Sequence, residues 1–158
     1  MVNWDYSSPS ITNAIFWNNQ DTSSNGTAQA SVANDNDSTP AFRYSLIQGC
    51  NPDGTWNTAC GTDGTDNLPD EDPLFVAMPD PADAPSTGGD LRLRPNSPAI
   101  DTGNNAALHA SITTDLAGRP RIQNGRIDLG AFEVNWLSVA VTAVAHGRIT
   151  APTSSPVG

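Results

Sequence analysis

Lysine is absent from this sequence, so arginine supplies all seven positive charges against seventeen acidic residues, for a formal net charge of −10. Nucleic acids and anionic membranes are bound through clustered lysine and arginine. A surface with this charge balance repels both, and we expect no nucleic-acid binding. The acidity suits solubility alone, a saline medium or calcium, and these alternatives stay open.

Long apolar runs are also missing. No run approaches the ~20 residues that a membrane-spanning helix needs, so we expect no membrane span. The start, Met1-Val2-Asn3-Trp4, leads straight into polar sequence without a signal peptide. We interpret Met1 as an expression start inside a longer natural protein. Only 15% of the residues are charged, and abundant Ser, Thr, Asn, Asp and Gly are typical of secreted β-rich proteins, which predicts an extracellular or cell-surface location.

Cysteine is scarce, with Cys50 and Cys60 alone enclosing a short loop that contains Pro52 and Gly54. Two cysteines cannot make a four-ligand zinc site. Neither His109 nor His146 has the spacing of a zinc ligand beside them. In an oxidising compartment a disulfide would close this turn-rich loop, and we favour that over two free thiols.

Long regular elements are excluded from residues 89–133 by frequent glycine and proline. Turn-forming residues there bound four brief apolar runs, at 91–93, 99–100, 121–122 and 127–129. This pattern is typical of short strands separated by tight turns. The segment is therefore expected to form a compact arrangement of short strands.

A recurring unit is visible earlier in the chain. ITNAIFWNN at 11–19 and FRYSLIQGC at 42–50 each place a short apolar strand before a polar corner, about 30 residues apart. Stacked repeats of this kind bury their apolar faces against their neighbours. A further unit is expected at DPLFV, residues 72–76.

Several of these pieces together resemble a known family. ITNAIFWNN, YSLIQG, DPLF, GDLRLRPNSPAIDTGNN, TDLAGRPRI and IDLGAFE occur in this order over about residues 9–133. They resemble the C-terminal end of bacterial extracellular right-handed parallel β-helix proteins, the pectate-lyase-like group with a variable surface anchor. The resemblance implies an all-β fold, a parallel β-helix fragment made of the last coils plus a C-terminal cap built by SPAID and IDLGA.

Two domain assignments follow. Residues 1–133 are expected to form the coils and cap, and residues 134–158 a strand-like tail or the truncated start of a following all-β module, because apolar and small polar residues alternate there. The earlier coils of such a solenoid are missing. We therefore expect self-association through the uncapped N-terminal coil, or a lid formed by residues 1–8 with Trp4 and Tyr6.

An acidic, glycine-rich loop is the candidate metal site. Calcium takes six to eight oxygen ligands, which such loops provide, so calcium is the candidate cofactor. The spacing differs from that of the EF-hand loop, and a solvated acidic loop is the alternative that we favour. Asp before Pro is also a common turn former, which makes the last of these residues a structural candidate. The candidate ligands are Asp63, Asp66, Asp70 and Asp72, with Glu71 among them.

Asp101, Asp115 and Asp128 stand in the motifs SPAID, TTDLAG and IDLGA. A pair of them could hydrolyse glycosides as acid and base or nucleophile. Alternatively, all three accept backbone N–H bonds from tight turns, which needs no substrate and is preferred. A pectate-lyase mechanism would need a base beside a calcium-bound acidic sugar, and without lysine an arginine would have to serve. The arginines considered, which are Arg92, Arg94, Arg119 and Arg121, are instead expected to pair with carboxylates.

Trp56 and Asn57 are the candidate carbohydrate contacts. Indole rings stack on sugars, and Trp56 lies in the loop between the cysteines with Asn57 beside it to bind hydroxyls. Packing inside the protein is the alternative. Trp17 stands in an apolar strand and is expected in the core.

The preferred function is non-catalytic: an extracellular β-helix scaffold or carbohydrate-contact segment of a larger secreted or surface protein, with a polysaccharide as its partner. The alternative is a polysaccharide-active glycoside hydrolase or lyase that uses the three aspartates.

Overall fold

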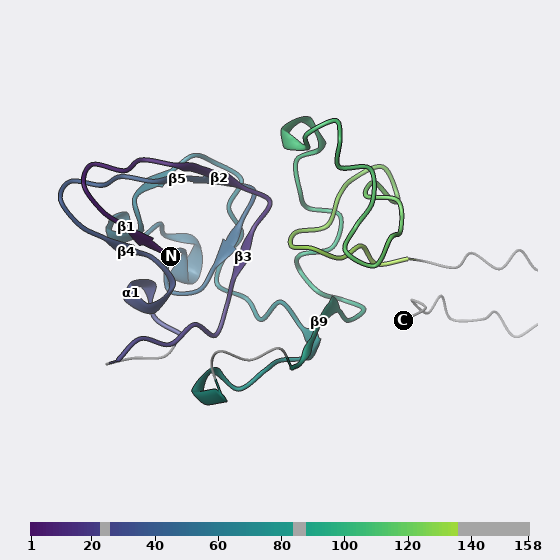
Figure 1. The fold of residues 1–158 in the computed structure, drawn as a ribbon, viewed down its shortest axis with the longest axis horizontal. Helices are drawn as coiled ribbons and strands as arrows, with labels where there is room; N and C mark the ends of the chain where they lie inside the picture. The colour runs from purple at the N-terminus through teal and green to yellow at the C-terminus, as the bar shows by residue number, and fades with distance from the viewer. Residues whose placement is uncertain (23–25, 84–87, 136–158) are drawn as a thin grey trace, which may run out of the picture.

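The N-terminal part of the protein is built from two stacked layers of very short parallel strands. The structure is a computed structural model that describes residues 1–22, 26–83 and 88–135 (Figure 1). In the first layer lie β1 (Val2–Asn3), β2 (Ser10–Thr12) and β3 (Ile15–Phe16). They pair in parallel with β4 (Ala33–Asn34), β5 (Ala41–Arg43) and β6 (Leu46–Ile47). Equivalent residues are 31 positions apart, as in Asn3 and Asn34, which agrees with the interval that the sequence indicates.

Side chains at the corners hold the two layers in register. Asn3 Nδ2 donates to Asn34 Oδ1 at 2.7 Å, and the Asn18 N–H donates to Gln48 Oε1 at 2.8 Å. Asn13 and Asn18 have φ values of 62° and 54°, a left-handed conformation that asparagine tolerates well. Asn13 and Asn18 are therefore two of the residues that let the chain turn after β2 and β3.

The remaining elements are short. A third strand, β7 (Thr62–Asp63), adds to β5 in parallel, and α1 (Ala28–Ser31) begins where the Thr27 hydroxyl accepts from the Ala30 N–H at 3.2 Å. β8 (Phe75–Ala77) and β9 (Asp90–Leu93) form an antiparallel pair. Four 3₁₀ turns complete the described elements: η1 (Pro52–Gly54), η2 (Thr58–Cys60), η3 (Pro81–Asp83) and η4 (Asn105–Ala107).

Two apolar cores hold the described chain together. The first lies inside the layers, where Phe16 packs edge-on against Phe42 with 6.1 Å between ring centroids. The second joins the layers to the segment after β9, which Figure 1 shows as a separate coil of chain beside them. Its buried members are Leu46, Leu93, Ala99, Leu129 and Val134. Each large apolar side chain buried in this way contributes about 1.5–3 kcal/mol.

The predicted fold class, a right-handed parallel β-helix fragment with a terminal cap, is wrong. In the described parts of the chain the strands form four small sheets of two or three strands each, and none of them closes or curls into a helix. The expected unit at 72–76 turns back instead, because β8 pairs antiparallel with β9. Residues 99–135 contain η4, two isolated antiparallel bridges and turns rather than a layer of strands, and side-chain contacts to the backbone hold several of these turns.

The free edge of the layers is only partly covered. β1, β2 and β3 each pair on one side. Ile11 and Phe16 are half-buried there, whereas their partners Phe42 and Ile47 are 0% and 1% exposed. Trp4 and Tyr6 are 61% and 74% exposed and form no lid over this edge.

We therefore expect two copies to associate through this edge, since unpaired strands recruit further strands. Sedimentation from low to high micromolar concentration should show a rising dimer fraction. Val2→Lys should hold the protein monomeric, because a lysine on an edge strand opposes pairing. Ile122→Lys, at another exposed apolar position, should leave the dimer intact. A single monomeric species throughout the series would contradict the expectation.

The predicted tail, residues 134–158, lies almost entirely outside the described residues, which end at Asn135. The domain boundary after residue 133 therefore stays a prediction.

Candidate functional site

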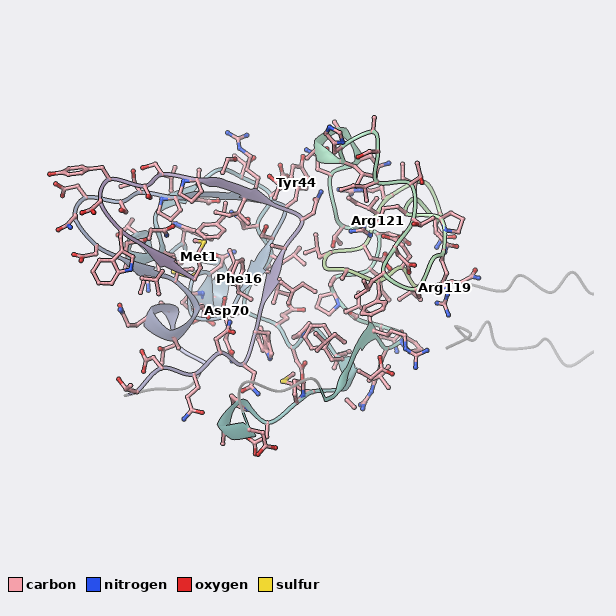
Figure 2. All side chains as sticks on the ribbon, viewed as in Figure 1. Met1, Phe16, Tyr44, Asp70, Arg119 and Arg121 are labelled. Atoms are coloured by element: carbon pink, nitrogen blue, oxygen red, sulfur yellow. A yellow bond between two sulfur atoms is a disulfide. The ribbon has the colours of Figure 1, made fainter. Side chains whose placement is uncertain are left out.

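Two of the three candidate catalytic aspartates lie in a buried charge cluster of four side chains. Asp115, Arg121, Asp128 and Glu133 are all buried, and Asp128 is 1% exposed. Figure 2 places Arg121 within the C-terminal part of the protein and Arg119 on its outer side. The question for function is whether these carboxylates face an open space or the protein's own backbone.

Asp115 binds the turn that follows it. Its Oδ1 accepts from the N–H groups of Ala117 at 2.9 Å and Arg119 at 2.8 Å, and its Oδ2 accepts from the Glu133 N–H at 2.9 Å. Both oxygens are thus used by the backbone. This is the turn role expected from the sequence.

Asp128 connects more distant parts of the chain. Its Oδ1 accepts from the Asp101 N–H at 2.7 Å and its Oδ2 from the Val134 N–H at 2.6 Å. Burial raises the pKa of the Asp128 carboxyl, and these two N–H bonds act in the opposite direction. Asp101 contributes its backbone N–H to this site, and the charge of its carboxylate also raises the pKa of Asp128. Its Oδ1 is buried without a hydrogen-bond partner among the described residues, so the expected role as an acceptor of backbone N–H groups is not seen for Asp101.

Arg121 supplies the positive charge of the cluster. It forms an ion pair with Glu133, and its Nη2 donates to the carbonyl oxygens of Gly130 at 2.7 Å and Asp128 at 3.3 Å. Burial lowers the pKa of the Arg121 guanidinium. The expected pairing of Arg121 with a carboxylate is confirmed. Glu133 was missed, and its place directly after the apolar run of IDLGAFE was the available signal.

The carboxylates of Asp115 and Asp128 are used by the protein's own backbone. A glycosidase needs two carboxylates on either side of a space that admits the sugar. Here Asp115 and Asp128 are buried and all four of their oxygens accept backbone N–H groups.

Asp115→Ala is accordingly expected to lower the free energy of unfolding by about 1–3 kcal/mol, because the buried Glu133 N–H loses its acceptor. Urea denaturation measures the change. Asp83→Ala, at an exposed position in η3, serves as the control and should change stability by less than about 0.5 kcal/mol. A variant at Asp115 with unchanged stability but abolished polysaccharide cleavage would instead establish a catalytic carboxylate.

The acidic side chains of the candidate metal loop accept hydrogen bonds from the protein itself. Asp70 accepts from the N–H groups of Gly49 at 2.6 Å and Asn51 at 3.0 Å, which ties two segments together. Asp63, Asp66 and Asp72 each accept a hydrogen bond from a residue of their own loop, respectively Asn67, Thr65 and Leu74. Within the described residues no three His, Cys, Asp or Glu side chains gather in a way that could hold a metal ion. The calcium site stays a prediction.

The predicted disulfide is confirmed, with 5.8 Å between the Cα atoms of Cys50 and Cys60. Trp56 and Asn57, the two candidate sugar contacts in the loop that this disulfide closes, both make contacts within the protein. Trp56 Nε1 donates to the Gly61 carbonyl at 2.9 Å, and its ring lies 6.0 Å from that of Phe42. Asn57 Oδ1 accepts from the Ala59 N–H at 3.0 Å. This geometry favours the packing alternative for Trp56.

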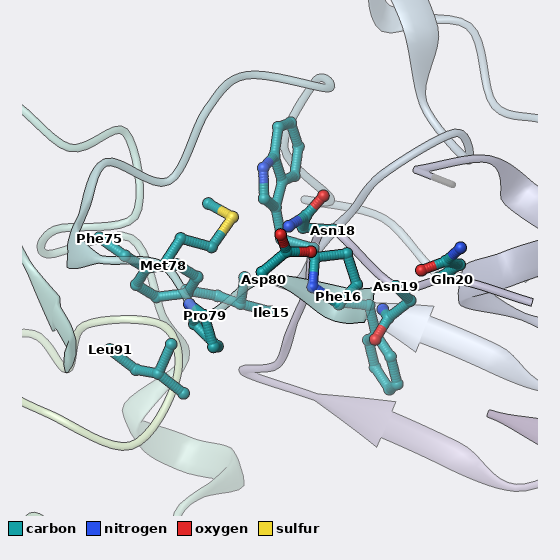
Figure 3. A pocket seen from close by; sticks show the side chains of 12 residues that line it. Ile15, Phe16, Asn18, Asn19, Gln20, Phe75, Met78, Pro79, Asp80 and Leu91 are labelled. Carbon is teal, nitrogen blue, oxygen red and sulfur yellow. The ribbon is translucent and has the colours of Figure 1, made fainter. Parts of the chain in front are cut away.

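A pocket of about 410 Å³ lies elsewhere, between the end of β3 and the β8–β9 pair (Figure 3). Asn18, Asn19 and Gln20 follow one another along one side, and Phe75, Met78 and Leu91 gather on the other. The remaining lining residues are Ile15, Phe16, Trp17, Pro79, Asp80 and Pro81. We call this space the β3 pocket. Trp17, expected in the core, is half-buried and contributes to both the second core and this pocket.

His109 lies in a second pocket, of about 390 Å³. Its Nδ1 is 2.7 Å from Ser111 Oγ, a contact between neighbours in one turn. His146, the other histidine, lies outside the described residues. A hydrolytic triad also needs a carboxylate that orients the histidine. Among the described residues, no hydrogen bond between His109 and a carboxylate is seen.

No helix in the described part of the chain has the length and apolar character to cross a membrane. Comparison of the chain with protein-family models, with curated proteins and with solved structures gives no match.

Proposed function

We propose that this protein is a non-catalytic, carbohydrate-contacting segment of an extracellular protein and that the β3 pocket is its contact site. The observation that carries the proposal is the lining of that pocket. Aromatic rings from Phe16, Trp17 and Phe75 share it with three consecutive side-chain amides.

This combination suits a sugar ring. The C–H face of a pyranose packs on aromatic surfaces, while its hydroxyl groups need donors and acceptors in fixed positions. Asn18, Asn19 and Gln20 provide both. The corner at Asn18 is fixed by the bond from its N–H to Gln48, so the amide-bearing segment is held by the second layer.

Two further observations support the proposal. The disulfide between Cys50 and Cys60 fits an oxidising, extracellular setting. Asp80 is the one ionisable side chain among the described residues that line the pocket. A single carboxylate cannot supply the acid and base pair that glycoside hydrolysis needs.

The test is calorimetric titration of the purified protein with a panel of soluble oligosaccharides, with calcium and with chelator. Gln20→Ala and Asn19→Ala should each weaken binding at least about fivefold, the scale of a lost hydrogen bond. Asn124→Ala, an exposed amide outside the pocket, should bind as the unchanged protein does. Absence of binding to every glycan would refute the proposal. Cleavage of a glycan that is lost in Asp115→Asn or Asp128→Asn would refute its non-catalytic part.

A further inference from the structure

We infer that the β3 pocket selects uncharged sugars and discriminates against uronic acids. The inference rests on the proposed function, because it names the class of sugar that the same pocket accepts. It differs from the acidic polysaccharide that a pectate-lyase-like mechanism would use.

The charge inside the pocket has one sign. Asp80 is exposed, and it is the charged residue among the described lining side chains, which include neither arginine nor histidine. Its Oδ1 accepts from the Ala82 N–H at 2.9 Å, which fixes the carboxylate at the start of η3. Figure 3 shows Asp80 among the labelled side chains that line the pocket. A uronate in this pocket would meet a fixed carboxylate of its own sign.

Arg92 and Arg94, the arginines nearest to Leu91 along the chain, already bind partners within the protein. Arg92 follows the lining residue Leu91, and its guanidinium binds Asp90 through Nε at 2.9 Å and Nη2 at 2.6 Å. The hydrogen bonds with Arg92 lower the pKa of Asp90 to about 2. Arg94 Nη2 donates to the Val76 carbonyl oxygen at 2.5 Å. Both guanidinium groups therefore already have partners within the protein, and these contacts do not direct them towards a sugar carboxylate in the pocket.

A uronate would therefore lose part of its hydration without gaining a cationic partner, which is unfavourable. The formal net charge of −10 adds long-range repulsion that salt screens. A neutral sugar avoids both effects. We expect at least a tenfold difference in affinity, which corresponds to about 1.4 kcal/mol.

The experiment uses pairs of hexamers that share linkage and ring stereochemistry and in which one member carries C6 carboxylates and the other is uncharged. α-1,4-Linked galacturonate hexamer is compared with its fully methyl-esterified form, and a β-1,4-glucose hexamer with the matching glucuronate hexamer. In low salt the neutral member of a pair should bind at least tenfold more tightly, and added sodium chloride should reduce this ratio of affinities. Asp80→Asn should reduce the ratio several-fold by improving uronate binding. Asp37→Asn, an exposed acid that is not part of the pocket lining, should leave it unchanged.

The outcomes separate the two proposals. Equal affinity for the charged and neutral members would overturn charge selection while the carbohydrate-contact function stands. Tighter binding of a uronate, or a gap that Asp80→Asn leaves intact, would also overturn it. Failure of all four hexamers and of the wider glycan panel to bind would refute the proposed function itself.

Discussion

Replacing Arg121 with methionine is expected to lower the free energy of unfolding by about 3–5 kcal/mol, the cost of leaving one member of a buried ion pair without its partner. The Glu133 side chain is fully buried and pairs with this guanidinium. The carbonyl oxygens of Gly130 and Asp128 lose a donor at the same time. Methionine fills a similar volume, so the loss reports charge and hydrogen bonding rather than a cavity. Urea denaturation followed by circular dichroism measures it.

The control is Arg92→Met. This ion pair with Asp90 lies at the surface, with 38% and 27% of the two side chains exposed, and its loss should cost no more than about 1 kcal/mol. If Arg121→Met does not fold, adding Glu133→Gln should restore part of the stability, because the uncompensated charge is then removed. A single Arg121→Met variant with wild-type stability would show that the buried charge cluster contributes little to the fold.

Reduction of the disulfide is expected to cost about 3 kcal/mol. The bond between Cys50 and Cys60 closes a loop with a sequence separation of 10, and the loop-entropy relation gives this magnitude for a loop of that length. Both residues are fully buried against the first core. In a chain of 158 residues the loss corresponds to a melting temperature about 6–12 °C lower. Differential scanning calorimetry with and without a phosphine reductant measures the shift.

The double variant Cys50→Ala, Cys60→Ala provides the control, because its melting temperature should not respond to reductant. It should also melt below the oxidised protein. Identical melting of the oxidised and reduced forms would mean that the surrounding core, including Trp56 and Phe42, holds the loop closed without the covalent bond.

Local features of the fold were predictable because they depend on residues close in sequence. The apolar runs at 11–19 and 42–50 contain β3 and β6, and their spacing matches the 31-residue register. The disulfide followed from a short turn-rich loop, and the turn role of Asp115 from the glycine-bearing sequence after it. Each of these needs only a short stretch of chain or one recurring pattern.

Features that depend on distant segments were missed. The β3 pocket joins residues 15–20 to Phe75, residues 78–81 and Leu91. Neither stretch of sequence indicates that it will contact the other. The fold class was wrong because the sequence signal for strands does not specify their direction, and β8 pairs with β9 in antiparallel orientation. Glu133 was missed because its partner Arg121 lies 12 positions earlier, across several turns.

The constant register between the two layers also determines how the chain can fold. Forming the first pair of strands closes a loop of about 30 residues, which costs conformational entropy. Once β1 has paired with β4, the connections to β2 and β5 are only a few residues long in both layers, so the later pairs close at little further cost. We therefore expect formation of the first strand pair to limit the folding rate and the later pairs to form rapidly after it.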